Sequence, residues 1–418
     1  MRLKYGLEET PPLPEFLLVS LQWLAVIGFI LIIAGRVIAE MQYESGFEKT
    51  IYLQKVFFIA GLTLLAQLFF GHRLPLVIGP SAVLMVGIYA SLESGFEAIY
   101  TSIAVCGAIL FIFAITGKLN LLRRFFTERI VVVVLLLVAI SLIPVIMDLI
   151  LIEDPFYNLL FSIAFIISLF AFSVRFKSFW NFLVILWLLF GTVIHLWIFP
   201  KALIIPDLEI AGFFYGLNLN LTFKPEVIFA FLICFLALAI NDLSSIYSLG
   251  EILKVSGMEN RVTKGVSLTG ISNLFSGFLG VVGMVNYTLS PGMISATKCA
   301  SRSTLIPAGL VLIVIAFIPA VISLFGSIPK VVVGSIFLYI MCSQIAVALA
   351  MVKLEDIDSG LIIGFPVLLA VLIAFIPKTA LDSFPEIIKP ILGNSFVMGV
   401  LTAMLMEHLV FRSKYAGS

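Results

Sequence analysis

Long apolar runs separated by short polar segments constrain the fold of this chain more than any other feature. A helix needs about 20 apolar residues to cross the hydrocarbon layer of a bilayer, and about fourteen such runs follow one another along the sequence. Of the 418 residues, 61% are hydrophobic and only 12% are charged. We therefore expect an all-α polytopic membrane protein. The runs lie near 16–38, 50–70, 74–91, 96–116, 130–150, 156–174, 179–199, 226–249, 263–283, 285–299, 303–325, 330–352, 358–376 and 391–411.

Two of these runs contain a break that includes a proline. Residues 78–82 (Ile-Gly-Pro-Ser-Ala) interrupt the third run, and residues 289–293 (Leu-Ser-Pro-Gly-Met) interrupt the tenth. Their prolines lie 211 positions apart, and the same offset relates Pro14, which opens the first run, to Pro225, which opens the eighth. Broken spans at matching positions of two halves indicate the binding site of a secondary transporter built from a repeat.

The longest polar interruption, 200–224, divides the runs into seven and seven. An odd number of spans in each half forces the second half to insert upside down relative to the first. We therefore predict an inverted repeat, with segments 1–7 in residues 1–224 and segments 8–14 in residues 225–418.

The distribution of Lys and Arg predicts the orientation in the membrane. With the amino terminus inside, the inward-facing segments collect most of the basic residues, while the outward-facing segments collect acids such as Glu40, Glu44 and Glu153. Basic loops are typical of the cytoplasmic side. We expect a multi-pass protein of the cytoplasmic (inner) membrane with both termini in the cytoplasm.

Each break should begin a half-helix, because proline is tolerated in the first turn of a helix but not in its interior. Free backbone N–H groups at such a start attract carbonyl or anionic oxygens. In an inverted repeat the two starts face one another near the midplane and can hold opposite edges of a small solute. The alternative is a pair of proline-kinked helices that bind no ligand.

The eighth run places polar residues about ten positions deep in the membrane. An ionisable residue at that depth costs at least about 2.5 kcal/mol by insertion scales and usually serves a function. Asn241 and Ser245 share one helical face, and Asp242 lies about 100 degrees around the helix. Asn241 and Ser245 could therefore contact a ligand while Asp242 titrates or binds a cation. The alternative is that Asp242 is a structural carboxylate hydrogen-bonded to a neighbouring helix.

Small residues in the ninth run predict close helix packing. The cysteines show no CxxC spacing and no nearby histidine, so we expect no metal and no disulfide, with H⁺ or Na⁺ as the only coupling ion considered. The residues expected to pack closely in the ninth run are Ser272, Asn273, Ser276, Gly277 and Gly280. The four cysteines are Cys106, Cys234, Cys299 and Cys342.

Several short segments resemble the nucleobase–cation symporter-2 family, the uracil/xanthine permeases. The resemblance is carried by Ser20–Gln22, Gly79–Ser81, Asn241–Ser245, Gly265–Leu268, Gly277–Gly280, Asn286–Tyr287, Gly292, Thr297 and Ser301–Arg302. It implies a core domain, about 14–117 and 225–326, that moves against a gate domain, about 127–199 and 328–411. It also implies proton- or sodium-coupled uptake of a purine, a pyrimidine or a related ring, and a homodimer formed through the gate domains.

The chain departs from the family at its ligand positions, which makes it a divergent member. Asn241 replaces a glutamate, Leu289 replaces a Glu or Gln, Ala82 replaces an aromatic residue and Trp23 replaces a histidine. A neutral Asn still bonds a carbonyl and an N–H edge but cannot take up a proton, so Asp242 is the candidate for ion coupling. The predicted substrate-binding residues are Asn241, Ser245, Ser81, Ala82, Leu289, Ser290, Gly292, Gln22 and Tyr287.

The sequence thus predicts a secondary active transporter of a nucleobase-like small polar solute that works by alternating access. Its partners would be that solute and the lipid bilayer, and not nucleic acid. One alternative is an oxyanion carrier with the related sulfate-transporter fold, which needs no acidic ligand. Another is a membrane receptor that does not transport. We do not expect an enzyme, because the spans hold no paired carboxylates, metal-ligand spacing or nucleophile motif.

Overall fold

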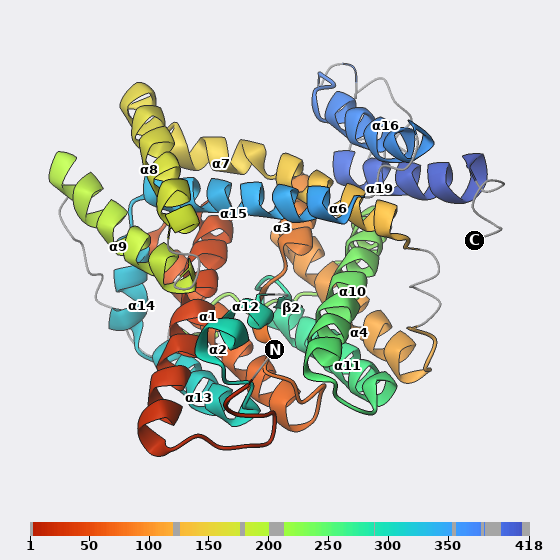
Figure 1. Cartoon of the computed structure of the whole chain (residues 1–418). Helices are drawn as coiled ribbons and strands as arrows, with labels where there is room; N and C mark the ends of the chain where they lie inside the picture. Colours follow the sequence, from red (N-terminus) through yellow and green to blue (C-terminus); the bar gives the residue numbers. More distant parts are fainter. Residues whose placement is uncertain are drawn as a thin grey trace.

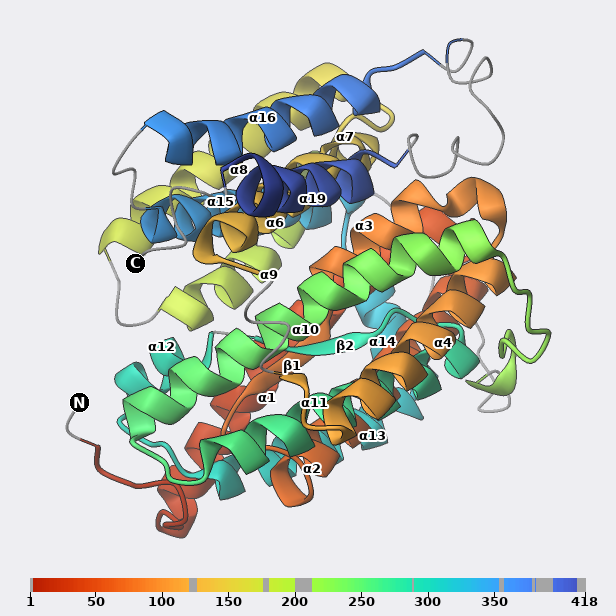
Figure 2. The ribbon, with the colours of Figure 1, turned by 90° about the vertical axis from the view of Figure 1, so that its right-hand side faces the viewer.

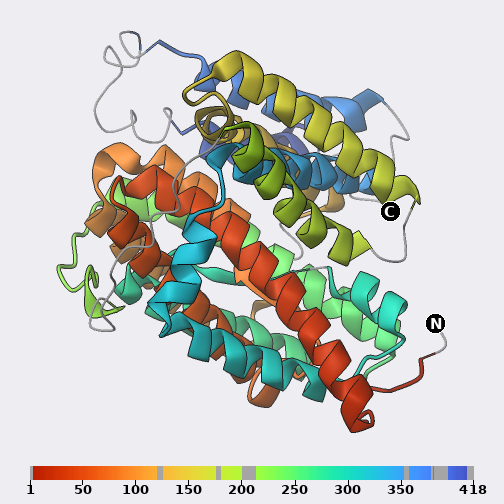
Figure 3. The same cartoon turned by 90° about the vertical axis from the view of Figure 1, so that its left-hand side faces the viewer.

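The computed structural model describes residues 3–119, 126–175, 180–199, 213–287, 289–352, 357–377, 380 and 394–411. Within them the chain is almost wholly helical, and its helices form two bundles that lie one above the other in Figures 2 and 3. The first bundle contains α1 (Leu13–Gln42), α2 (Gly46–Phe69), β1 (Val77–Pro80), α3 (Ala82–Ala90), η1 (Leu92–Ser94), α4 (Phe96–Ile115), α10 (Pro225–Leu253), α11 (Met258–Leu279), β2 (Met284–Tyr287), α12 (Ser290–Thr297), η4 (Arg302–Thr304), α13 (Leu305–Ala316) and α14 (Pro319–Gly326).

The second bundle combines segments from the middle of the chain with segments from its end. Figure 1 shows α15 running beside α6 and α7, with α16 and α19 next to one another. The bundle contains α6 (Glu128–Ser141), α7 (Ile143–Ile150), α8 (Pro155–Arg175), α9 (Trp180–Ile198), α15 (Lys330–Met351), α16 (Ile357–Ala374), α19 (Ser395–Leu405) and η5 (Met406–Val410).

Each predicted span corresponds to one or more of these elements. Among the described residues, eight helices are long and apolar enough to cross a membrane, or nine if the bent pair α13–α14 counts as one span. The polytopic helical fold is therefore confirmed. The predicted interruption at 200–224 and the last span at 391–411 fall partly on 200–212 and 391–393, which lie outside the described residues.

The two Pro-Glu pairs open helices as the sequence predicts. Pro14 lies in the first turn of α1 and Pro225 begins α10, where a missing N–H costs no hydrogen bond. Glu15 and Glu226 follow in the same turns, where a carboxylate interacts favourably with the positive end of the helix dipole.

Prolines also divide two spans that the sequence predicts as continuous. The fifth becomes α6 and α7, with Pro144 in the first turn of α7. The eleventh bends by 90° between α13 and α14, where Pro319 begins the second helix. The division at Pro144 and the bend at Pro319 are both expected, because proline lacks an N–H and its ring clashes with the preceding turn of a helix.

The third and tenth spans meet in a short antiparallel ribbon that the sequence analysis did not predict. β1 pairs with β2 in the register Val77 to Tyr287, Ile78 to Asn286, Gly79 to Val285 and Pro80 to Met284. Seven of the eight residues are buried and Tyr287 is half-buried, so the helices of the first bundle enclose the ribbon. Irregular backbone at membrane depth is tolerated when protein surrounds it in this way.

Candidate functional site

The two half-helices begin at opposite ends of the ribbon. β1 leads into α3 and β2 leads toward α12, and because the strands are antiparallel the two helices run away from the ribbon in opposite directions (Figure 2). The Ser81 hydroxyl caps α3 by accepting from Leu84 N at 3.4 Å. The Ser290 hydroxyl accepts from Val77 N at 2.9 Å and so joins the start of α12 to β1.

The breaks are present, but their prolines differ in position. Pro291 lies in the first turn of α12, as predicted. The prediction was wrong for Pro80, which ends β1, so α3 begins two residues later at Ala82. Gly79 allows a close approach here, because a Cβ on it would lie 2.8 Å from Ile30 Cγ2 and 2.9 Å from the Tyr287 ring.

Helix α10 covers the free edge of β2. Ser245 Oγ lies 3.0 Å from Asn286 O and 2.9 Å from Asn241 O, so its hydroxyl is bound to backbone carbonyls. The Asn241 side chain is half-buried and makes no hydrogen bond with another described residue. Two residues of α10 were predicted to contact a ligand, Asn241 and Ser245. Only the Asn241 side chain is free of hydrogen bonds to described residues.

Asp242 is completely buried and accepts three hydrogen bonds. Its Oδ1 accepts from Asn286 N at 3.1 Å and from Asn286 Nδ2 at 2.6 Å, and its Oδ2 accepts from Thr269 Oγ1 at 2.7 Å. The carboxylate thus joins α10 to α11 and β2. This is the arrangement expected for a structural carboxylate, and the role of Asp242 in ion coupling stays a prediction.

The other predicted ligand residues lie on α1 and around the half-helix starts. Gln22 is half-buried, and its Oε1 is buried without a hydrogen-bond partner among the described residues. Ala82 is half-buried, whereas Leu289 and Gly292 are exposed, and a Cβ on Gly292 would meet no atom within 4 Å. The Tyr287 hydroxyl donates to the Pro80 carbonyl across the ribbon.

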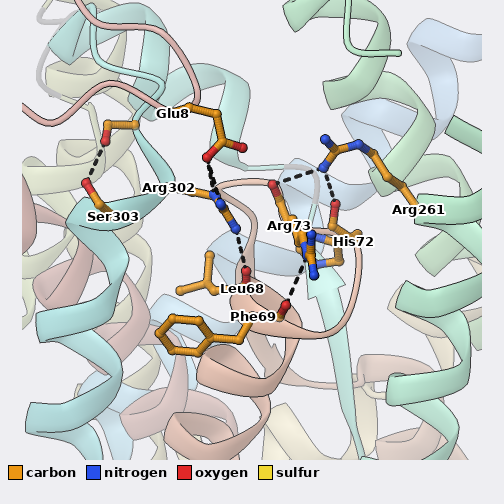
Figure 4. A network of polar contacts seen from close by, with 9 residues as sticks. Glu8, Leu68, Phe69, His72, Arg73, Arg261, Arg302 and Ser303 are labelled. Atoms are coloured by element: carbon orange, nitrogen blue, oxygen red, sulfur yellow. Dashed lines mark hydrogen bonds and ion pairs between the residues drawn. The ribbon is translucent and has the colours of Figure 1, made fainter. Parts of the chain in front are cut away.

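Two arginines bind the last turn of α2 and the link that follows it (Figure 4). Arg261 Nη1 donates to the carbonyl of His72 at 2.8 Å. Arg302 Nη1 donates to the carbonyl of Leu68 at 2.9 Å, and its Nη2 lies 2.6 Å from Glu8 Oε2. A cation beside the last carbonyls of a helix is stabilising, so Arg302 caps α2 while it binds the amino-terminal segment.

Polar residues beside Asp242 were missed by the sequence analysis. Gln67, His72, Thr269 and Asn286 are each at most 1% exposed, and they form a hydrogen-bonded group around its carboxylate. The available signal was their polarity within or beside apolar runs, since an intramembrane polar residue suggests a partner.

A cavity of about 690 Å³ lies elsewhere, at the end of α1 that is remote from Gln22. Residues of both bundles line it, including Arg36, Glu40, Lys49 and Lys330, and its lining contains none of the predicted ligand residues. We give more weight to the ribbon as the candidate site, because the broken helices and the free amide of Asn241 on α10 lie beside it, whereas none of the predicted ligand residues lines this cavity.

The arrangement offers hydrogen-bonding groups to a small solute. Among the parts of the chain that the structure describes, no three His, Cys, Asp or Glu side chains are grouped as metal ligands would be. Two helix starts and two free side-chain amides can instead supply hydrogen bonds to carbonyl oxygens and N–H groups of a small ring.

Comparisons with known proteins find relatives that are membrane permeases by name. The chain is 25% identical over 405 residues to the nucleobase transporter PlUacP of Paenibacillus larvae, which covers 90% of this chain and 91% of the relative. It is 26% identical to the uric acid permease PucK of Bacillus subtilis, over 86% of this chain and 87% of the relative.

A solved structure shares the fold. The transmembrane domain of the cyanobacterial bicarbonate transporter BicA aligns with a TM-score of 0.57 at 15% identity and covers 93% of this chain and 97% of that domain. The family model Xan_ur_permease, described as "Permease family", matches residues 14–379. The chain therefore belongs to this permease family, named for xanthine and uracil permeases.

Proposed function

We propose that this protein is a secondary active transporter of a nucleobase-like ring, a purine, a pyrimidine or a related compound, across the cytoplasmic membrane. Membership of the permease family over residues 14–379 is the observation that carries the proposal. The names of the relatives, a nucleobase transporter and a uric acid permease, support the class of substrate.

The substrate would bind between the half-helix starts and α10. The free amide of Asn241 and the unpartnered Oε1 of Gln22 offer both donors and acceptors, which match the adjacent C=O and N–H groups of such a ring. The backbone at Ala82 and Gly292 would contact its carbonyl oxygens. The remaining members of the proposed site are Ser81, Ser245, Tyr287, Leu289 and Ser290.

Transport would proceed by movement of one bundle against the other. In this proposal the core domain, about 14–117 and 225–326, carries the site, and the gate domain, about 127–199 and 328–411, is the fixed element and the contact of a homodimer. The inverted repeats would be 1–224 and 225–418. Both termini would lie in the cytoplasm, and H⁺ or Na⁺ would be coupled through Asp242.

Uptake into proteoliposomes tests this proposal. We expect saturable uptake of radiolabelled uracil, xanthine or uric acid, driven by a pH or sodium gradient. Asn241→Ala and Gln22→Ala should each reduce it, while Ser244→Ala serves as a control because Ser244 is exposed on the same helix. Absence of saturable uptake with every purine and pyrimidine tried would overturn the assignment.

An oxyanion such as bicarbonate or sulfate is the second candidate substrate. The fold of BicA favours it, as does the absence of an acidic ligand at Asn241 and Leu289, because two helix starts attract an anion without further charges. Bicarbonate and sulfate flux measured in the same proteoliposomes separates the two candidates.

A further inference from the structure

Asp242 and four other buried residues form a closed ring of hydrogen bonds. Gln67 Nε2 donates to Thr269 Oγ1 at 3.2 Å, and Thr269 Oγ1 donates to Asp242 Oδ2 at 2.7 Å. On the other side, Asn286 Nδ2 donates to Asp242 Oδ1 at 2.6 Å, and His72 Nε2 lies 3.1 Å from Asn286 Oδ1. The backbone N of His72 donates to Gln67 Oε1 at 3.4 Å and closes the ring.

The direction of the bonds made by the Asn286 side chain follows from His72. Its Nδ1 accepts from Leu74 N at 2.9 Å, so the proton of the neutral imidazole is on Nε2, which donates to Asn286 Oδ1. That bond fixes the Asn286 amide with its nitrogen toward Asp242. Without it the amide could rotate and present its oxygen to the carboxylate, which would be repulsive.

Two chains of donors therefore run from His72 to the Asp242 carboxylate. One passes through Gln67 and Thr269, and the other passes through Asn286. Asp242 takes part in no ion pair among the described residues, so three hydrogen bonds alone stabilise its charge. A sodium or other hard cation requires oxygen ligands and would face N–H and O–H groups here. A proton fits better, because Oδ2 has a hydroxyl partner, Thr269, that can change from donor to acceptor.

The same ring holds both strands of the ribbon. Asn286 belongs to β2, which leads within three residues to the first turn of α12, and its backbone N also binds Asp242. His72 lies in the link that leads into β1, and Arg261 binds its carbonyl (Figure 4). The charge on Asp242 is therefore connected by hydrogen bonds to β2, the strand that precedes the half-helix start that would contact the substrate.

We propose that His72 and Asn286 are positioning residues through which protonation of Asp242 changes the position of β2 and of the start of α12. This rests on the proposed function and names the proton as its coupling ion. When Asp242 is ionised, the ring holds β2 against α10. When Asp242 is protonated on Oδ2, its hydrogen bonds to Asn286 weaken and β2 is released.

Other charged groups lie away from this carboxylate on every element packed against α10. None of the residues of α3, α12, α19 or β2 is charged. Those of α4, α6 and α11 lie in the first two turns of their helices and are Glu97, Glu128, Arg129, Glu259, Arg261 and Lys264. His72 is thus the titratable group that the ring connects to Asp242.

Variants at His72 test the positioning role by their pH profile. His72→Gln keeps a side-chain N–H near the position of Nε2, whereas His72→Leu removes it. We expect His72→Leu to move the pH of half-maximal uptake upward by about one unit, because the Asn286 amide is then no longer fixed and its side-chain hydrogen bond to the charged Asp242 is lost. His72→Gln should restore the wild-type midpoint, and Asp242→Asn should abolish the pH dependence.

Two variants at Thr269 provide an independent test in case the His72 variants do not fold. Thr269→Val removes the hydroxyl and keeps the branched shape, and Thr269→Ser keeps the hydroxyl. Thr269→Val should shift the midpoint and Thr269→Ser should not. If His72→Leu or Thr269→Val takes up substrate with an unchanged midpoint, the inference is wrong. It is also wrong if uptake requires sodium and does not depend on pH.

Infrared titration of the purified protein separates this inference from the proposed function, because it needs no substrate. The carbonyl stretch of a protonated buried carboxyl should appear as the pH falls, should be absent in Asp242→Asn and should appear at higher pH in His72→Leu. If these changes occur without nucleobase uptake, the proposed function fails and the inference stands. If the band is identical in wild type and His72→Leu, the inference fails.

Discussion

Neighbouring polar residues of α10 differ in what their side chains already bind. The Ser245 hydroxyl is bound to two backbone carbonyls, and Asp242 accepts three hydrogen bonds. Asn241, one position away, has an amide without a partner among the described residues. A group that is already hydrogen-bonded must give up that bond to bind a ligand, whereas a free amide has no bond within the protein to give up.

Alanine substitutions at these two positions should therefore have different effects. Asn241→Ala should raise KM for the transported ring at least about tenfold, which corresponds to about 1.4 kcal/mol of binding free energy. Ser245→Ala should lower the free energy of unfolding by about 1 kcal/mol, the value of one hydrogen bond, with a much smaller change in KM. Uptake kinetics and thermal unfolding of the two purified variants check both statements.

At this scale the sequence indicated which residues matter but not which residues they contact. Asp242 lies deep in an apolar run, which predicts a functional role for it. Its partners Thr269 and Asn286 lie 27 and 44 positions further along the chain, and no local pattern connects them. Their meeting depends on the packing of α10 against α11 and β2.

Helices α4 and α11 approach each other closely through glycines. A Cβ on Gly270 would lie 2.6 Å from Phe111 N, and one on Gly107 would lie 2.6 Å from Leu274 N. A Cβ on Gly277 would lie 2.5 Å from Tyr100 O, which confirms the predicted packing role of this residue. Such contacts are with backbone atoms, which cannot rotate away, so van der Waals packing of small residues holds this pair.

Replacing a glycine in this contact should destabilise the protein. We expect Gly270→Ala to lower the free energy of unfolding by about 1–3 kcal/mol through overpacking, seen as a lower melting temperature in detergent. Gly364→Ala in α16 is the matched control, since its Cβ would meet nothing within 4 Å. It should be neutral or slightly stabilising because alanine favours the helix. Equal destabilisation by both substitutions would contradict this account.

The helices were predictable at the element scale, and the ribbon was not. Apolar runs of sufficient length specify helices because the bilayer leaves the backbone no other way to form its hydrogen bonds. Four-residue strands such as Val77–Pro80 are too short to show a pattern of alternation, and their pairing joins segments about 200 positions apart. The prolines predict where the helices are interrupted, but they do not predict that the interrupted segments pair as strands.

At the scale of the whole molecule, counting spans predicts a division into two halves, but it does not predict the contacts between the two bundles. One such contact is an ionic cluster in the cavity beside the end of α1. Glu40 Oε2 lies 2.8 Å from Lys49 Nζ and 2.9 Å from Lys330 Nζ, and Glu40 Oε1 lies 2.7 Å from Arg36 Nη2. Lys330 belongs to the second bundle and the other three residues belong to the first.

This cluster predicts that the bond between Glu40 and Lys330 breaks whenever the bundles separate at this end. Glu40 would keep Arg36 and Lys49 as partners, so breaking the bond leaves no unpaired buried charge. Lys330→Gln should therefore favour the open form. For a partly exposed ion pair the effect is about 1 kcal/mol or less, which is an increase of up to about fivefold in the population of that form.

Cysteine labelling measures this change. In a protein whose four native cysteines are replaced, Ser323→Cys places a thiol in the cavity lining at a position that is only 4% exposed. A membrane-impermeant maleimide should modify it faster in Lys330→Gln than in the parent. Lys49→Gln is the matched control, because Lys49 binds the same oxygen of Glu40 at nearly the same distance but lies in the same bundle. If both substitutions accelerate labelling equally, the bond to Lys330 does not restrain the bundles, and loss of charge around Glu40 alone opens the cavity.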